Sequence, residues 1–117
     1  GAVSGITLLM GGARSGHERV VELLLQHDAE INLQSNEGFT ALTAAVIKGH
    51  ERVVDLLIRH GAEINLQSSK GYTALMSAAR QGHPAVVRRL LRAGADTALR
   101  SESGRTALQA AKKKGHA

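Results

Sequence analysis

The sequence of 117 residues contains no cysteine and no tryptophan, one proline, and only two aromatic residues, Phe39 and Tyr72. Without cysteine the chain has no disulfide framework, no zinc–thiolate site and no thiol nucleophile. With so few aromatic rings, its core must be built from Leu, Val, Ile and Ala. No apolar run approaches the roughly 20 residues that a membrane-spanning helix needs, so we expect no membrane partner.

The net charge of +5 is distributed unevenly along the chain. Residues 5–37 carry two arginines and five acidic residues, which gives −3, whereas residues 71–104 give +3 and residues 105–117 give +4. This gradient would steer an acidic partner toward the C-terminal half. A solvated surface without such a partner is the alternative.

The dominant feature is an internal repeat with a period of 33 residues. Residues 16–35 and 49–68 are identical at 16 of 20 positions. The same period separates four glycines and the threonines two residues after them: Gly5, Gly38, Gly71 and Gly104, with Thr7, Thr40, Thr73 and Thr106. It also separates four Gly-His pairs, which begin at Gly16, Gly49, Gly82 and Gly115. A fixed period of this length is typical of a stacked repeat array.

One unit of the repeat consists of two short helical patterns and a turn. Thr40 is a suitable N-cap for a first helix, and Gly49 ends it. Residues 51–59 place apolar side chains at the i, i+3 and i+4 positions of a second helix, which Gly61 follows. Residues 62–71 are polar and end in a turn. Helices this short are unstable alone, so neighbouring units must cover one another's apolar faces.

At this period the pattern Gly-x-Thr-Ala-Leu-x-x-Ala, Gly-His, Val-Val-x-Leu-Leu and Gly-Ala resembles the ankyrin repeat. The resemblance covers essentially the whole chain. It implies an all-α repeat solenoid in which ankyrin-type helix-turn-helix pairs stack and are linked by β-hairpin-like loops. We expect a single ankyrin repeat domain over residues 1–117, with repeats at about 5–37, 38–70 and 71–103 and a partial repeat at 104–117.

Several positions depart from the family pattern Thr-Pro-Leu-His. The proline is replaced by Leu8, Ala41, Ala74 and Ala107, and the histidine by Met10, Thr43, Met76 and Gln109. The hydrogen bonds that this histidine makes at the start of the first helix must therefore be missing or remade. Gln109 is suited to close a capping box with Thr106.

The first unit contains two further departures. Gly11 and Gly12 lie inside its first helix. Together they lower the stability of that helix by about 1–2 kcal/mol relative to alanine. Asp28 stands where the later units have Gly61 and Gly94, at a position that requires the left-handed backbone conformation. We therefore expect the first unit to be the least stable.

The histidines do not form a plausible metal site. His17, His50, His83 and His116 recur once per unit, and packed helices lie about 8–10 Å apart. Two nitrogens on one zinc ion must lie within roughly 4 Å of each other. We expect these histidines to cap or brace the turn between the two helices, and we expect no bound metal.

Catalysis and nucleic-acid binding are not indicated either. The glycine-rich segment 11–16 lacks the Gly-Lys-Ser/Thr ending of a phosphate-binding loop, and the repeat accounts for its glycines. The basic groups, Arg88, Arg89 and Arg92 and the run 112–114, are not accompanied by stacking aromatics. We expect neither an enzyme nor a cofactor, and no nucleic-acid partner.

Residues that vary at equivalent positions are the candidates for binding, because repeat arrays bind along an extended surface. The resemblance implies a protein or peptide partner on the concave groove and the hairpin tips, an intracellular location in cytoplasm or nucleus, and a monomer. Acidic groups of the partner would face the C-terminal half. The candidate protein-binding residues are Ile6, Arg14, Phe39, Ile47, Lys48, Ser69, Lys70, Tyr72, Arg80, Gln81, Arg105 and Lys113.

A second interpretation is a designed or consensus-like stable scaffold that has no natural ligand. The near-identity of residues 16–35 and 49–68 favours it. Residues that differ between equivalent positions of the units, and the glycine pair in the first helix, argue against deliberate idealisation. The apolar residues at 6–10 and the partial last unit lead us to expect a segment of a longer array or an engineered chain.

Overall fold

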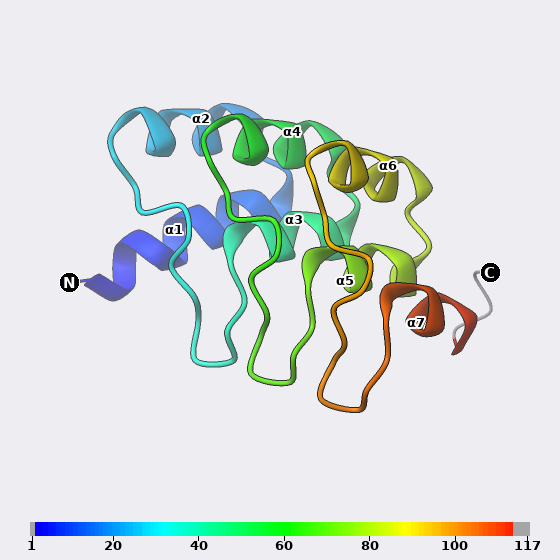
Figure 1. The fold of residues 1–117 in the computed structure, drawn as a ribbon. Helices are drawn as coiled ribbons and strands as arrows, with labels where there is room; N and C mark the ends of the chain where they lie inside the picture. The colour runs from blue at the N-terminus through cyan, green and yellow to red at the C-terminus, as the bar shows by residue number, and fades with distance from the viewer. Residues whose placement is uncertain (1, 114–117) are drawn as a thin grey trace.

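The computed structural model describes the backbone of residues 2–113 and the side chains of residues 8–112, and this part of the chain forms helices and no strand. The helices are α1 (Ala2–Ser15), α2 (Glu18–Gln26), α3 (Ala41–Lys48), α4 (Glu51–Arg59), α5 (Ala74–Gln81), α6 (Pro84–Arg92) and α7 (Ala107–Lys113). The odd-numbered helices form one row and the even-numbered helices a second row, and three hairpin loops extend side by side from them (Figure 1). The expected all-α stack of helix pairs is confirmed.

Local sequence determines where the first helices of the middle units begin and end. The side chains of Thr40 and Thr73 accept hydrogen bonds from the backbone N–H groups three residues later, as N-caps do. Thr43 completes a capping box with Thr40, which replaces the hydrogen bonds of the missing family histidine. Both helices end at glycines with φ of 74°, Gly49 and Gly82.

The last described helix has the expected capping box. Thr106 N donates to Gln109 Oε1 at 2.9 Å, and Gln109 N donates to Thr106 Oγ1 at 3.4 Å. The first helix differs from the others, because α1 begins at Ala2 and continues through Gly5 and Thr7. In the later units the equivalent glycine has positive φ and turns the chain into the N-cap, whereas Gly5 is helical.

The core lies between the two helix rows and consists of aliphatic residues from every unit. Leu42 and Leu75 of the odd row and Val54 and Leu57 of the even row are buried. The helices that carry these side chains, α3, α4 and α5, each contact helices of an adjacent unit as well as the helix with which they are paired. This packing is the reason that the sequence repeats, since each unit presents the surface that the next unit covers.

The hairpin loops are held by the same backbone bonds in each unit and by bonds between units. Ser35 N donates to Phe39 O, and Gly38 N donates to Ser35 O, both at 2.8 Å. The loops that begin at Ser68 and Ser101 repeat this arrangement. Adjacent hairpins are joined where Ser69 N donates to Glu37 O at 2.9 Å and Glu102 N donates to Lys70 O at 2.7 Å. The loops therefore form a continuous surface.

His50 and His83, which recur once per unit, stabilise the stack by bonding across the boundary between two units. His50 Nε2 lies 2.9 Å from the carbonyl oxygen of Arg14, and His83 Nε2 lies 3.1 Å from that of Ile47. His17, His50 and His83 occupy N-cap positions without a side-chain capping bond. Of the two expected roles, capping or bracing, His50 and His83 therefore have the second. The last carbonyl groups of a helix have no partner within the helix, so those of Arg14 and Ile47 are free to accept a bond from the imidazole of the next unit. His116 lies outside the described residues.

The first unit has the expected backbone departures. Asp28 adopts φ of 64°, and it is the one non-glycine residue with positive φ among those described. Gly11 and Gly12 are helical within α1. Large apolar side chains are exposed at both ends of the stack, with Leu8 at one end and Leu108 at the other.

Candidate protein-binding surface

A groove of about 470 Å³ lies between α1 and α3, beside the first hairpin. Both helices contribute residues at i, i+3 or i+4 spacing, which places them on one helix face. Phe39 enters from the segment just before the N-cap Thr40. The lining residues are Met10, Gly11, Arg14, Phe39, Ala44, Ile47 and Lys48.

The groove combines an apolar interior with two cations at its edge. Met10, Phe39 and Ile47 are half-buried, so each ring or chain retains accessible apolar surface. Arg14 and Lys48 are exposed at the ends of their helices. This arrangement suits an apolar side chain of a ligand that has a carboxylate nearby.

The backbone on both sides of the groove is fixed by hydrogen bonds. Phe39 N donates to Ser35 Oγ at 3.2 Å, and Phe39 O accepts from Ser35 N at 2.8 Å. The carbonyls of Arg14 and Ile47 accept the bonds from the histidines of the following units. The groove is therefore pre-organised, which lowers the entropic cost of binding.

Gly11 keeps the groove open. A Cβ atom placed on Gly11 would have no heavy atom within 4 Å, because the residue faces open space. The equivalent residue of the next unit, Ala44, carries a methyl group on the opposite wall. The absence of a side chain at Gly11 therefore widens the groove on the side of α1.

The repeating helix pairs and hairpins are those of a known protein family. A family model described as ankyrin repeats (three copies) matches residues 2–68 and again residues 54–117. The chain belongs to the ankyrin repeat family. Ankyrin repeats generally mediate interactions between proteins. A search of the curated proteins found no significant match. None of the described helices combines the length and apolarity needed to cross a lipid bilayer.

The ankyrin groove brings together four of the residues singled out from the sequence: Arg14, Phe39, Ile47 and Lys48. Tyr72, although equivalent to Phe39, packs against the core and does not line this groove. Arg80, Gln81 and Arg105 are exposed farther along the stack. The side chains of Ile6 and Lys113 lie outside the described residues.

The hairpin-tip candidates have structural contacts of their own. Ser69 Oγ donates to Glu37 O at 3.0 Å, in addition to the bond that Ser69 N makes to the same oxygen. Lys70 O accepts from Glu102 N, while the Lys70 side chain is exposed. Ser69 thus joins two ankyrin hairpins, and Lys70 presents a charge beside that junction.

Sequence reasoning missed three residues of the groove: Met10, Gly11 and Ala44. In the sequence, Met10 and Gly11 stand out only as departures from the ankyrin pattern. The available signal was their spacing, since Met10 and Gly11 precede Arg14 by four and three residues. Ala44 has the same relation to Lys48 and Ile47.

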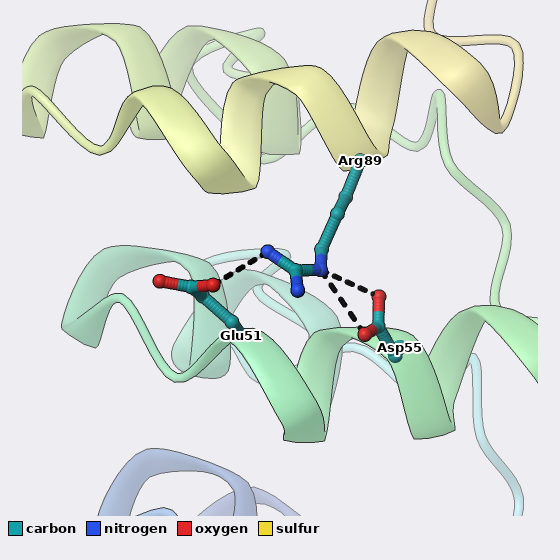
Figure 2. Close-up of polar contacts among 3 residues, drawn as sticks. All are labelled: Glu51, Asp55 and Arg89. Carbon is teal, nitrogen blue, oxygen red and sulfur yellow. Dashed lines mark hydrogen bonds and ion pairs between the residues drawn. The ribbon is translucent and has the colours of Figure 1, made fainter.

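A separate polar cluster joins two helices of the even row. Figure 2 shows the Arg89 side chain reaching from α6 toward Glu51 and Asp55 on α4. Arg89 Nε donates to the two carboxylate oxygens of Asp55 at 2.9 and 3.0 Å, and Nη1 donates to Glu51 Oε1 at 2.6 Å. Hydrogen bonds to Asp55 and then to Glu51 raise the pKa of Arg89 above its ordinary value. Arg89 therefore has a structural role in the ankyrin stack.

The described residues contain no group of three or more His, Asp or Glu side chains that is arranged to hold a metal ion.

Proposed function

We propose that this ankyrin repeat chain binds a protein or peptide partner through the groove between α1 and α3. The observation that supports this most directly is the groove itself, where Phe39 and Ile47 form an apolar surface bordered by Arg14 and Lys48. Interaction hot spots lie in apolar pockets, and the rim of a protein interface is polar.

The partner that fits has an apolar side chain flanked by an acidic residue. Its apolar group would lie between Met10, Phe39 and Ile47, and its carboxylate would approach Arg14 or Lys48. Arg80 and Arg105 continue the positive surface toward the C-terminal units, where further acidic residues of a longer ligand would lie. The hairpin tips at Ser69 and Lys70, with Gln81, would contribute contacts outside the groove.

We infer that the chain acts by binding and not by catalysis. The side chains of His50 and His83, which might otherwise serve as bases, are bonded to carbonyl groups of the preceding unit. The hydroxyl groups of Thr40 and Thr73 cap helices. These polar groups therefore have structural roles, and the variable residues remain for recognition.

A peptide-display selection on the full chain tests the proposal. We expect enriched peptides that place a Leu, Phe or Met within two residues of an Asp or Glu. Phe39→Ala should lower their affinity by about tenfold or more, as removal of an interface anchor does. Lys48→Glu should lower it by about threefold to tenfold. Arg59→Ala, on the even row of helices, serves as the matched control and should leave affinity unchanged.

The same selection distinguishes the alternative of a stable scaffold without a ligand. That alternative predicts no enrichment above a scrambled library. Peptides that bind Phe39→Ala as tightly as the parent chain would refute the proposed groove, provided that thermal melting shows the variant to be folded.

A further inference from the structure

A charged cleft of about 770 Å³ lies between α4 and α6, on the side of the even-numbered row that faces away from the core. Both helices are paired with an odd-numbered helix, α4 with α3 and α6 with α5, and Figure 1 shows them side by side within the stack. Four arginines and two carboxylates line the cleft: Arg59, Arg88, Arg89, Arg92, Glu51 and Asp55. These side chains give the cleft a net charge of +2.

Only one of the four arginines is engaged by the carboxylates of the cleft. The guanidinium group of Arg89 bonds to both Glu51 and Asp55 (Figure 2). The other three arginines take no part in the ion pairs formed among residues 8–112. Their side chains are all exposed. The cleft therefore has positive charge that the described chain does not balance.

Comparison of α4 with α6 shows that this charge is not required by the fold. The fully buried positions of the two helices are occupied by the same residue types, Val and Leu. On the exposed side of α4, Asp55 and Arg59 are four residues apart and opposite in charge, which stabilises a helix. At the equivalent positions α6 has Arg88 and Arg92, a pair of like charges at a spacing where they repel. An anion bound between these two arginines would remove the repulsion.

The cleft is also larger than its counterpart one unit earlier. The equivalent cleft between α2 and α4 has a volume of about 370 Å³ and is lined by the long side chain of Arg52. At the equivalent position α6 has Ala85, which lines the cleft between α4 and α6. The shorter side chain leaves space for a group of a ligand beside the arginines.

The distribution of charge along the cleft indicates which kind of anion fits. Glu51 and Asp55 lie about two turns and one turn before Arg59 on the same helix, and their side chains are 48% and 43% exposed. A nucleic-acid strand or an anionic bilayer, which is negative along its whole length, would meet these carboxylates as well as the arginines. The ligand that fits therefore carries its negative charge at one point.

A phosphate group meets this requirement better than a carboxylate. It concentrates a charge of about −1.5 to −2 and three acceptor oxygens at one point. The planar guanidinium group of arginine matches the geometry of phosphate and binds it with paired hydrogen bonds. Three arginines that are free of ion pairs suit a group with several acceptor oxygens.

We propose that the cleft between α4 and α6 binds a phosphorylated side chain of a partner protein, with the phosphate held by Arg88 and Arg92 of α6 and by Arg59 of α4. A basic residue of the partner, about three or four positions from the phosphorylated one, lies beside Glu51. This spacing follows because the eight residues from Glu51 to Arg59 span about 12 Å of helix, the length of about four residues of extended peptide. The site is independent of the groove between α1 and α3.

A short phosphopeptide titrated into the full 117-residue chain tests the proposal. The probe is acetyl-Ala-Lys-Ala-Ala-pSer-Ala-Ala-amide, and the two matched peptides carry Ser or Glu in place of the phosphoserine. Binding is followed by the Nε–Hε signals of arginine in an NMR titration. We expect shifts at Arg59, Arg88 and Arg92 but not at Arg52. The phosphopeptide should bind about tenfold tighter than the Ser peptide and about threefold tighter than the Glu peptide.

Three variants separate binding from folding and from the other groove. Arg88→Asp restores the pair of opposite charges found in α4, so it should leave the chain at least as stable in urea unfolding. The same change should lower the affinity for the phosphopeptide by about tenfold or more, because it replaces a cation of the site with an anion. Arg52→Gln, in the neighbouring cleft, is the matched control and should leave the affinity unchanged. Phe39→Ala should also have no effect.

Four outcomes would overturn the proposal. The first is an absence of arginine shifts at millimolar phosphopeptide. The second is equal affinity for the phosphopeptide and for either matched peptide, or for inorganic phosphate alone. The third is unchanged affinity of a folded Arg88→Asp variant. The fourth is binding that Phe39→Ala removes, because the peptide would then occupy the groove between α1 and α3.

Discussion

His83 Nε2 lies 3.1 Å from the carbonyl oxygen of Ile47, so the imidazole of one unit donates a hydrogen bond to the helix end of the unit before it. The ring also lies over Gly49, where a Cβ atom would come within 2.9 Å of His83 Cε1. Glycine and histidine therefore act together across the unit boundary: the glycine leaves the space, and the histidine of the next unit occupies it. His50 has the same relation to Arg14 and Gly16.

Removal of this brace should destabilise the stack. His83→Ala leaves the Ile47 carbonyl without the imidazole donor and should lower the free energy of unfolding by about 1–2 kcal/mol in urea titration. His17→Ala is the matched control, because His17 is exposed and makes no side-chain capping bond. It should cost less than about 0.5 kcal/mol. Equal effects of the two substitutions would argue against a bond between units.

The hairpin glycines allow backbone strain to be separated from close packing. Gly71 and Gly104 both have φ of 80°, so alanine causes the same strain at either position, about 1–2 kcal/mol. At Gly71 the new Cβ would also lie 2.8 Å from Glu102 N, whereas at Gly104 it would meet nothing within 4 Å. Gly71→Ala should therefore cost about 1–3 kcal/mol more than Gly104→Ala in chemical denaturation. Similar losses of stability in the two variants would show that adjacent hairpins can move apart without lowering the free energy of unfolding.

The helix ends and the stacked architecture were predictable because their signals are local and recur at each period. Thr40 as an N-cap, Gly49 as a helix end and the capping box of Gln109 each depend on residues within four positions of one another. Asp28 in the left-handed region follows from its alignment with Gly61. The start of α1 was not predictable in this way, because a threonine caps a helix only when the preceding chain is turned away from it.

The candidate site was predictable only in part, because it depends on how two units face each other. Phe39 and Ile47 stood out as variable positions, but the sequence could not show that Met10 lies across the groove from them. Similarly, Arg88 and Arg89 are adjacent and form one basic group in the sequence. The orientation of α6 about its axis directs Arg89 toward Asp55, whereas Arg88 lines a groove formed by α5, α6 and α7.

The two glycines of α1 should respond differently to alanine. Gly11→Ala adds helix propensity in open space and should stabilise the chain by about 0.5–1 kcal/mol in thermal or urea unfolding. Gly12→Ala gains the same propensity, but its Cβ would lie 3.3 Å from Val21 Cγ2 and 3.4 Å from Val20 Cγ1. The valines must shift, so the gain should be smaller or reversed. A larger gain at Gly12 than at Gly11 would contradict this account.

Replacement of Asp28 by glycine should stabilise the first unit. Because Asp28 has φ of 64°, Asp28→Gly should relieve strain and raise the free energy of unfolding by about 0.5–1 kcal/mol. Hydrogen exchange should slow within α2 more than within α4. The reciprocal change, Gly61→Asp, is the control and should destabilise the chain, since Gly61 has φ of 92° and open space around it. Stabilisation by both changes would show that backbone strain is not the cause.

The ion pair between α4 and α6 should contribute a stability that does not vary with pH in the neutral range. A raised pKa in the folded state means that the contribution of Arg89 is complete below its unfolded pKa and is lost only as pH rises through the folded value. Because that window lies far above the neutral range, Arg89→Gln should lower the free energy of unfolding by a constant amount between pH 6 and pH 9. The loss should shrink in 1 M salt, where exposed charges are screened. Arg92→Gln, at an exposed position of the same helix, should have a smaller effect. A loss that changes steeply between pH 6 and pH 9, or equals that of Arg92→Gln, would show that Arg89 does not act through its bonds to Asp55 and Glu51.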